Sequence, residues 1–127
     1  MLLVSIVACS GSPTEPDRVR TGRPFDLRVG DSALTTDDLR IRFDTVRSDS
    51  RCPIDAICVR AGEAVIAITL SLRGEVAIGR ELETVPSRSQ VTHSRFTVTL
   101  SELQPYPRSD RQTQPNDYIA TFVVSVR

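Results

Sequence analysis

The chain has 127 residues, of which 39% are hydrophobic and 25% are charged. A chain of this length can bury one hydrophobic core but not two, so the sequence predicts a single domain. The 16 basic and 16 acidic residues balance, and the arginines are scattered, which argues against a nucleic-acid partner. No run of about 20 apolar residues is present, so any membrane attachment must come from the N-terminus.

The first eight residues, MLLVSIVA, form a short apolar segment that ends at Cys9 and is followed by a polar stretch rich in Pro and Ser. Such a segment is typical of a secretory signal. The four residues from Ile6 to Cys9 resemble the lipobox of bacterial lipoproteins, in which cleavage before the cysteine frees it for acylation. The resemblance implies a lipoprotein signal peptide over residues 1–8. Because this segment is short and lacks the usual basic residue, we expect the natural start to lie upstream.

The lipobox resemblance also implies how the protein is held. Cys9 would carry two or three acyl chains, which anchor stably where a single chain binds only marginally. Ser10, in the place of an Asp, implies the outer membrane in diderm bacteria of the enteric type. Residues 9–21 are then the lipidated cysteine and a flexible spacer, and residues 22–127 are the domain.

An alternative interpretation makes residues 1–8 the first strand of the domain and Cys9 an ordinary thiol. Pro13 and Pro16 argue against a strand that continues there, because proline cannot donate a hydrogen bond to a sheet. The cysteine count also favours lipidation, since three cysteines are an odd number for an exported protein.

Cys52 and Cys58 remain as a pair, and we expect them to form a disulfide in an oxidising compartment. Pro53 favours a turn that brings their Cα atoms within bonding distance. Closing so short a loop stabilises the fold by about 2 to 2.5 kcal/mol in the chain-entropy description. The alternative is a metal site that adds His93 to the two thiolates, but zinc sites usually space their cysteines more closely and need a fourth ligand.

Alternation of apolar and polar residues predicts the strands. Residues 39–46 and residues 64–72 alternate clearly, and Gly74 offers a turn into residues 76–78, which predicts a hairpin. The other expected strands cover residues 25–29, 95–100 and 118–126, with a seventh at residues 32–35. The one helical candidate, residues 101–104, is short and meets a proline.

Six or seven short strands without intervening helices predict an all-β fold: an antiparallel β-sandwich or a barrel-like domain with one disulfide. Two segments are expected to be irregular. The first is residues 48–62, which hold the cysteine pair, and the second is residues 104–117, a polar loop with three prolines.

The segment DSRCPIDAICVRAGEA, residues 49–64, resembles a segment of small uncharacterised bacterial lipoproteins and secreted β-domains. In that family the second cysteine precedes a Trp-Ala-Gly-Glu-Ala run that leads into a strand. A late Pro-x-Pro segment and a Tyr-led final strand also match, at residues 105–107 and Tyr118. Arg60 stands where the family has Trp. The resemblance implies fold and location, and no activity.

Within this segment we expect Arg51 to reach a carboxylate, such as that of Asp55 or Glu63, and Gly62 to permit a bulge or a positive φ. A structural loop and a ligand-binding loop are both open interpretations. The candidate binding residues are Asp49, Arg51, Ile54, Asp55, Ile57 and Arg60.

No Ser or Cys lies in a nucleophile-elbow sequence, no Gly-rich phosphate loop is present, and His93 is the only histidine, so we expect neither catalysis nor a cofactor. A small enzyme would need a deep pocket that joins His93 to carboxylates. We predict a monomeric, lipid-anchored domain of the bacterial cell envelope, on the periplasmic side of the outer membrane or at the cell surface. It would act as a non-enzymatic binding or structural module, with an envelope protein as partner.

The alternative function is a periplasmic inhibitor of a protease or other hydrolase that inserts residues 48–62. Exposure of Ile54 or Ile57 at the loop tip would favour the inhibitor, and burial of both would argue against it.

Overall fold

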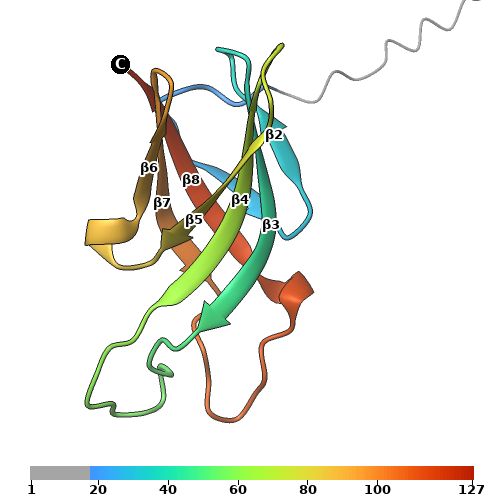
Figure 1. The fold of residues 1–127 in the computed structure, drawn as a ribbon. Helices are drawn as coiled ribbons and strands as arrows, with labels where there is room; N and C mark the ends of the chain where they lie inside the picture. Colours follow the sequence, from blue (N-terminus) through green and yellow to red (C-terminus); the bar gives the residue numbers. More distant parts are fainter. Residues whose placement is uncertain (1–17) are drawn as a thin grey trace, which may run out of the picture.

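The computed structural model describes residues 18–127, so the signal segment and Cys9 lie outside the described residues. Eight strands form two four-stranded antiparallel sheets, which pack on each other as a β-sandwich and do not close into a barrel (Figure 1). The strand orders are β1-β8-β7-β6 and β2-β3-β4-β5. None of the described residues belongs to a helix that is long and apolar enough to span a membrane.

The first strand and the last three form one sheet, and the four strands between them form the other. The first sheet contains β1 (Phe25–Arg28), β6 (Gln90–His93), β7 (Phe96–Gln104) and β8 (Ile119–Val126). The second sheet contains β2 (Ser32–Leu34), β3 (Leu39–Asp49), β4 (Ala64–Leu72) and β5 (Ile78–Glu83). Two short 3-10 turns, η1 (Pro86–Arg88) and η2 (Pro115–Asp117), lie in the connections.

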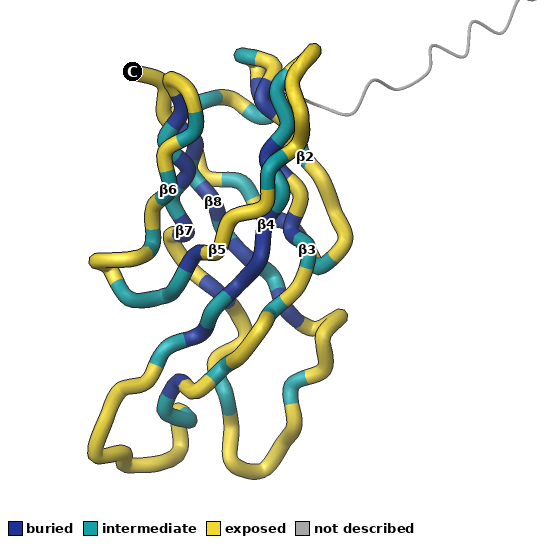
Figure 2. The backbone as a smooth tube through the Cα atoms, in the orientation of Figure 1, coloured by how far each residue is buried: buried dark blue, intermediate teal, exposed yellow. Residues whose placement is uncertain are grey.

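The core fills the space between the two sheets. Along β3, Leu39, Ile41 and Phe43 are fully buried while the arginines between them are exposed, as the period of two requires. Phe43 meets Phe122 of the opposite sheet edge to face, with ring centroids 6.2 Å apart. Figure 2 shows the buried residues lining the inside of the sandwich and the exposed ones on its loops.

The predicted all-β sandwich with one disulfide is confirmed, but there are eight strands instead of six or seven. The additional strand is β6, whose alternating residues are only half-buried, so its sequence carries little hydrophobic signal. The predicted hairpin after β4 forms, but its second strand is β5 and not residues 76–78, because Val76 lies in the exposed turn.

Residues 101–104, the helical candidate, continue β7. A bulge between Leu100 and Glu102 shifts the register by one residue. Leu103 therefore points into the core with Leu100, although an uninterrupted strand would place them on opposite faces. Because of this bulge, the second half of β7 does not follow the alternation of apolar and polar residues, and the sequence did not predict it as a strand.

The two ends of the sandwich differ. At one end lie the connection β3 to β4, residues 50–63, and the connection β7 to β8, residues 105–118, which we call the Cys loop and the Pro loop (Figure 1). At the other end, the N-terminal end, lie residue 18, the C-terminus and the turn between β4 and β5. There the amide of Val19 donates to the carbonyl of Leu34 at 2.9 Å, so residues within the predicted spacer already contact the domain.

Candidate functional site

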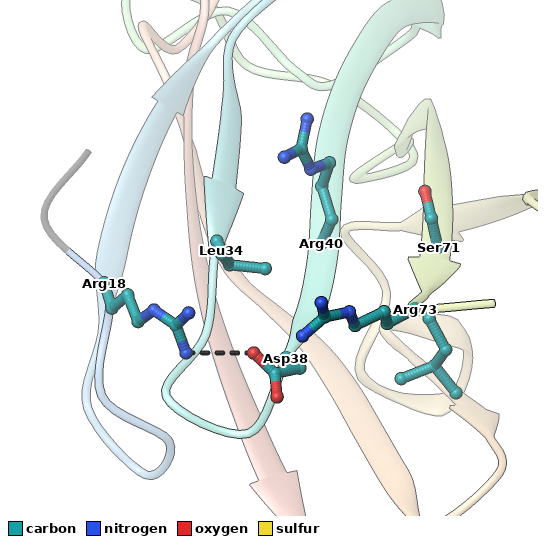
Figure 3. Close-up of a pocket in the computed structure, with 7 residues that line it drawn as sticks. Arg18, Leu34, Asp38, Arg40, Ser71 and Arg73 are labelled. Atoms are coloured by element: carbon teal, nitrogen blue, oxygen red, sulfur yellow. Dashed lines mark hydrogen bonds and ion pairs between the residues drawn. The ribbon is translucent and has the colours of Figure 1, made fainter. Parts of the chain in front are cut away.

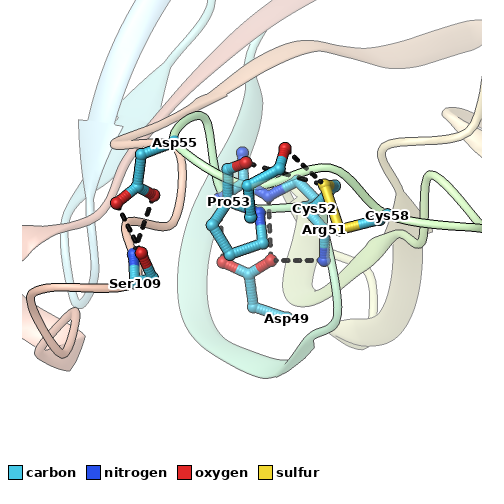
Figure 4. The surroundings of a disulfide bond; sticks show 8 residues. Asp49, Arg51, Cys52, Pro53, Asp55, Cys58 and Ser109 are labelled. Carbon is cyan, nitrogen blue, oxygen red and sulfur yellow. Dashed lines mark hydrogen bonds and ion pairs between the residues drawn. A yellow bond between two sulfur atoms is a disulfide. The ribbon is translucent and has the colours of Figure 1, made fainter.

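The Cys loop and the Pro loop extend from different sheets and are bonded to each other. The amide of Ile54 donates to the carbonyl of Pro107 at 3.0 Å. The carboxylate of Asp55 accepts hydrogen bonds from the amide of Ser109, at 2.9 Å, and from its hydroxyl (Figure 4). The two loops therefore form one composite surface at this end of the sandwich.

The predicted disulfide between Cys52 and Cys58 is present, with Cα atoms 5.9 Å apart. The amide of Cys52 donates to the carbonyl of Ala61 at 3.0 Å, which closes the loop above its base. Both sulfur atoms are bonded to each other in the disulfide, so the metal alternative loses two of its three ligands. Within residues 18–127, no group of three or more His, Cys, Asp or Glu side chains is placed to hold a metal ion.

Arg51 fastens the base of the Cys loop to the first sheet, and this residue is only 8% exposed. Its guanidinium pairs with both carboxylate oxygens of Asp49, Nε to Oδ1 at 2.9 Å and Nη2 to Oδ2 at 2.8 Å. The same group donates to the carbonyls of Leu103, at 2.6 Å, and Pro105, at 2.9 Å. Its carbon Cζ lies 5.0 Å from the ring centroid of Tyr106, which is close enough for a cation-π contact.

Arg51 reaches a carboxylate as expected, but the partner is Asp49 and not Asp55 or Glu63. Residues two apart at the end of an extended strand point to the same side, so Asp49 lies nearer to Arg51. Asp55 is instead engaged by Ser109 of the Pro loop.

Asp49 and Tyr118 complete the buried polar cluster around Arg51. The hydroxyl of Tyr118 donates to Oδ2 of Asp49 at 3.0 Å. Burial acts to raise the pKa of Asp49, but the hydrogen bonds and charge of Arg51, together with the Tyr118 hydroxyl, lower it below its usual value. Burial and the neighbouring Asp49 carboxylate raise the pKa of Tyr118 to about 12. The cluster is therefore a charged anchor for the loops at neutral pH.

Gly62 lies at the neck of the Cys loop with a φ of 66°, as the sequence predicted. A Cβ atom at this position would lie 1.9 Å from the carbonyl oxygen of Ser50. The hydroxyl of Ser50 in turn bonds the amide and the carbonyl of Glu63, at 3.1 and 2.9 Å. Only glycine permits the two sides of the neck to approach this closely.

The outer part of the Cys loop exposes apolar side chains. Ile57 and Val59 are fully exposed, and Ile54 is 61% exposed. Arg60 is also exposed, whereas the candidate residues Asp49 and Arg51 are engaged in holding the loop. Sequence reasoning missed Val59, because a valine shortly before a strand gives no sign of which way it points.

A cavity of about 280 Å³ opens between the Cys loop and β7. Arg51, Gly62, Glu102, Leu103 and Tyr106 contribute to its walls. The hydroxyl of Tyr106 donates to Oε1 of Glu102 at 3.4 Å, and Tyr106 is 46% exposed. Beside the apolar tip, the site therefore offers a hollow with a half-exposed aromatic ring and a carboxylate.

His93 lies apart from these loops. It ends β6, pairs in register with Phe96, and belongs to the turn at the N-terminal end of the sandwich (Figure 1). The loop surface therefore contains no histidine.

Comparison of the chain with protein-family models, with curated proteins and with solved structures finds no match. We therefore infer the function from the geometry of the loop surface and from the N-terminal sequence.

Proposed function

We propose that this protein is a lipid-anchored β-domain of the bacterial cell envelope that binds a protein partner through the Cys loop and the Pro loop and has no catalytic role. The observation that carries the proposal is the exposure of Ile54, Ile57 and Val59 on a loop that is fixed in place. The Cys52–Cys58 disulfide closes this loop, and hydrogen bonds connect it to the Pro loop. Large apolar side chains that stand clear of a small domain mark an interaction site. A loop that is already ordered loses little conformational entropy on binding.

The proposed anchor is consistent with the placement of the two ends. Nine residue steps separate Cys9 from Arg18, a span of at most about 30 Å when fully extended. The Cys loop lies at the end of the sandwich remote from residue 18. A protein tethered through Cys9 would therefore direct the Cys loop and the Pro loop away from the lipid surface.

Intact mass of protein purified from a bacterial membrane fraction, with thiol alkylation, tests the anchor. We expect loss of the residues before Cys9, added acyl mass on Cys9 and no alkylated thiol. An unprocessed chain in the soluble fraction would overturn the proposed anchorage.

Photocrosslinking tests the binding surface. A photoreactive amino acid at position 57 is compared with one at position 76, since Val76 is 85% exposed but lies in the turn at the opposite end. We expect position 57 to give an adduct of discrete mass in envelope preparations and position 76 to give none. Identical adducts from both positions, or none from position 57, would contradict the proposal.

The inhibitor is a second candidate, and the exposure of Ile54 and Ile57 favours it. A disulfide-closed loop with aliphatic side chains suits a hydrolase whose primary pocket accepts such side chains. Titration of aliphatic-specific serine proteases tests this function. Stoichiometric loss of activity that Ile57→Asp abolishes and Val76→Asp leaves intact would establish it, and unimpeded degradation of the loop would exclude it.

A further inference from the structure

A pocket of about 340 Å³ at the N-terminal end of the sandwich gathers three arginines (Figure 3). Its polar lining consists of Arg18, Asp38, Arg40, Ser71 and Arg73. These side chains come from the segment before β1, the turn between β2 and β3, β3 itself, β4 and the turn after β4. Residues distant in the sequence thus converge on one concave site.

The pocket carries an excess of positive charge. Nη1 of Arg18 lies 2.9 Å from Oδ1 of Asp38, which forms an ion pair at the pocket. Within residues 18–127, neither Arg40 nor Arg73 forms an ion pair. Among the described residues, the guanidinium groups of Arg40 and Arg73 are thus exposed without an acidic partner.

The turn that holds Asp38 is tightly organised. Asp38 has a φ of 68°, and its amide donates to the carbonyl of Thr35 at 3.0 Å. Thr35 is fully buried, and its hydroxyl accepts a hydrogen bond from the amide of Leu39 at 3.1 Å. Aspartate adopts the left-handed conformation more readily than most residues, so a tight turn accommodates it here. The turn directs the Asp38 carboxylate toward Arg18 and so orients that guanidinium at the rim.

We infer that this arginine pocket binds a phosphate ester. Guanidinium groups donate paired hydrogen bonds to phosphate oxygens, and a tetrahedral phosphate presents oxygens in several directions at once. A planar carboxylate would present only two oxygens to three arginines that come from different segments. The hydroxyl of Ser71 lies in the same lining and can donate to the anion.

Apolar side chains complete the pocket and indicate what the phosphate is attached to. Leu34 and Leu72 line it between the arginines and are half-buried. The pocket volume of about 340 Å³ lies within the range of small-molecule sites, and it is larger than inorganic phosphate alone needs. The ligand is therefore a phosphate mono- or diester whose carbon portion contacts the leucines. A phospholipid headgroup and a free phosphate ester both supply this chemistry.

The test uses the full chain with Cys9→Ser, made under oxidising conditions, so that no attached lipid contributes to binding. One arm titrates inorganic phosphate and glycerol 3-phosphate and follows backbone amide shifts. The other arm measures cosedimentation with phosphatidylglycerol vesicles against phosphatidylcholine vesicles. We expect shifts confined to the turns that flank Asp38 and Arg73, or cosedimentation with the anionic vesicles alone, or both.

The double variant Arg40→Gln/Arg73→Gln should weaken whichever binding occurs by at least about tenfold, since each lost guanidinium removes charge-assisted hydrogen bonds. The matched control Arg28→Gln/Arg80→Gln removes the same charge from exposed positions outside the pocket and outside the loop surface, and should keep the wild-type affinity. Binding to soluble esters without vesicles assigns a free ester, and the reverse assigns a headgroup. Absence of binding in both arms, or an equal loss in the control, would overturn the inference.

Discussion

At the scale of single residues, Arg51 contributes most to the candidate site without touching a ligand. Its guanidinium satisfies the Asp49 carboxylate and the carbonyls of Leu103 and Pro105, which belong to the other sheet. A buried guanidinium that joins both sheets determines where the Cys loop and the Pro loop stand. The binding surface therefore depends on a residue that it does not expose.

Replacement of this arginine should be costly. In Arg51→Met the Asp49 carboxylate loses its charged partner and two carbonyl groups lose a donor, and we expect the free energy of unfolding to fall by about 2 to 4 kcal/mol. Urea denaturation followed by circular dichroism measures the change. The control is Arg60→Met in the exposed part of the same loop, which should stay within about 0.5 kcal/mol of the wild type. Equal losses in the two variants would contradict the anchoring role of Arg51.

The lowered pKa of Asp49 predicts a dependence of stability on acid. Burial opposes the charged form, but Arg51 and Tyr118 outweigh it, so the folded protein holds this carboxylate below the usual pKa of 3.8. A group whose pKa is lower when folded contributes stability above its unfolded pKa, and this contribution disappears as pH falls through the folded pKa. We expect the urea midpoint to fall as pH drops below about 4, and to fall less in Asp49→Asn. Parallel pH profiles for both proteins would exclude Asp49 as the source.

Substitution of Gly62, at the neck of the Cys loop, tests whether this position needs a residue without a side chain. Gly62→Ala brings a Cβ into contact with the Ser50 carbonyl and forces a left-handed conformation on a residue with a side chain. We expect a loss of at least about 2 kcal/mol in unfolding free energy. Gly79→Ala is the matched control, because a Cβ there meets nothing within 4 Å and needs no positive φ. It should be neutral or slightly stabilising.

At the scale of elements, the disulfide and the hydrogen bonds to the Pro loop share the task of ordering the Cys loop. We expect Cys52→Ser/Cys58→Ser to fold with the sandwich intact and to lose about 2 kcal/mol. Amide hydrogen exchange should quicken in residues 50–63 and stay unchanged in β4 and β7. Fast exchange throughout both sheets would show instead that the disulfide supports the whole domain.

The strands could be predicted where a single buried face dominates the sequence. β3 alternates strictly over the part that contacts the core, and β4 does so apart from the small, buried Ala67. The prediction for β4 agrees with the structure, and that for β3 covers all but its last residues. β6 could not be predicted, since it lies at the sheet edge with only half-buried side chains and therefore has little apolar pattern. Bulges conceal the ends of β3 and β7 in the same way, because each one shifts the inward-facing register.

The candidate loop was predictable as a segment but not as a surface. Cysteine spacing identified the disulfide, and the Gly62 position identified the neck. The partner of Asp55 is Ser109, which is 54 positions away, and no local pattern indicates such a contact. The same holds for the contact of Arg51 with the Leu103 carbonyl, 52 positions away. Contacts between loops of different sheets depend on how the sheets pack, which periodicity does not determine.

At the scale of the whole molecule, the two ends present different chemistry. The N-terminal end gathers Arg18, Arg40 and Arg73 around a pocket, and the far end exposes aliphatic side chains on the Cys loop. β3 alone spans 11 residues, or about 36 Å at the usual rise, so the two ends lie far apart. If the phosphate ester is a lipid headgroup, both proposed activities fit one orientation, in which arginines face an anionic lipid surface and the Cys loop faces away from it.

This orientation can be measured on the acylated protein. A fluorophore attached at Val76→Cys, in the turn at the N-terminal end, is compared with one at Ile57→Cys in vesicles that carry nitroxide on their headgroups. We expect stronger quenching at position 76, because a spacer of at most about 30 Å and the arginine pocket both hold that end near the surface. The same labels on the Cys9→Ser chain, in vesicles without anionic lipid, should show no quenching. Equal quenching at positions 57 and 76 would mean that the domain lies on its side or tumbles freely, and the Cys loop would then have no preferred access to a partner.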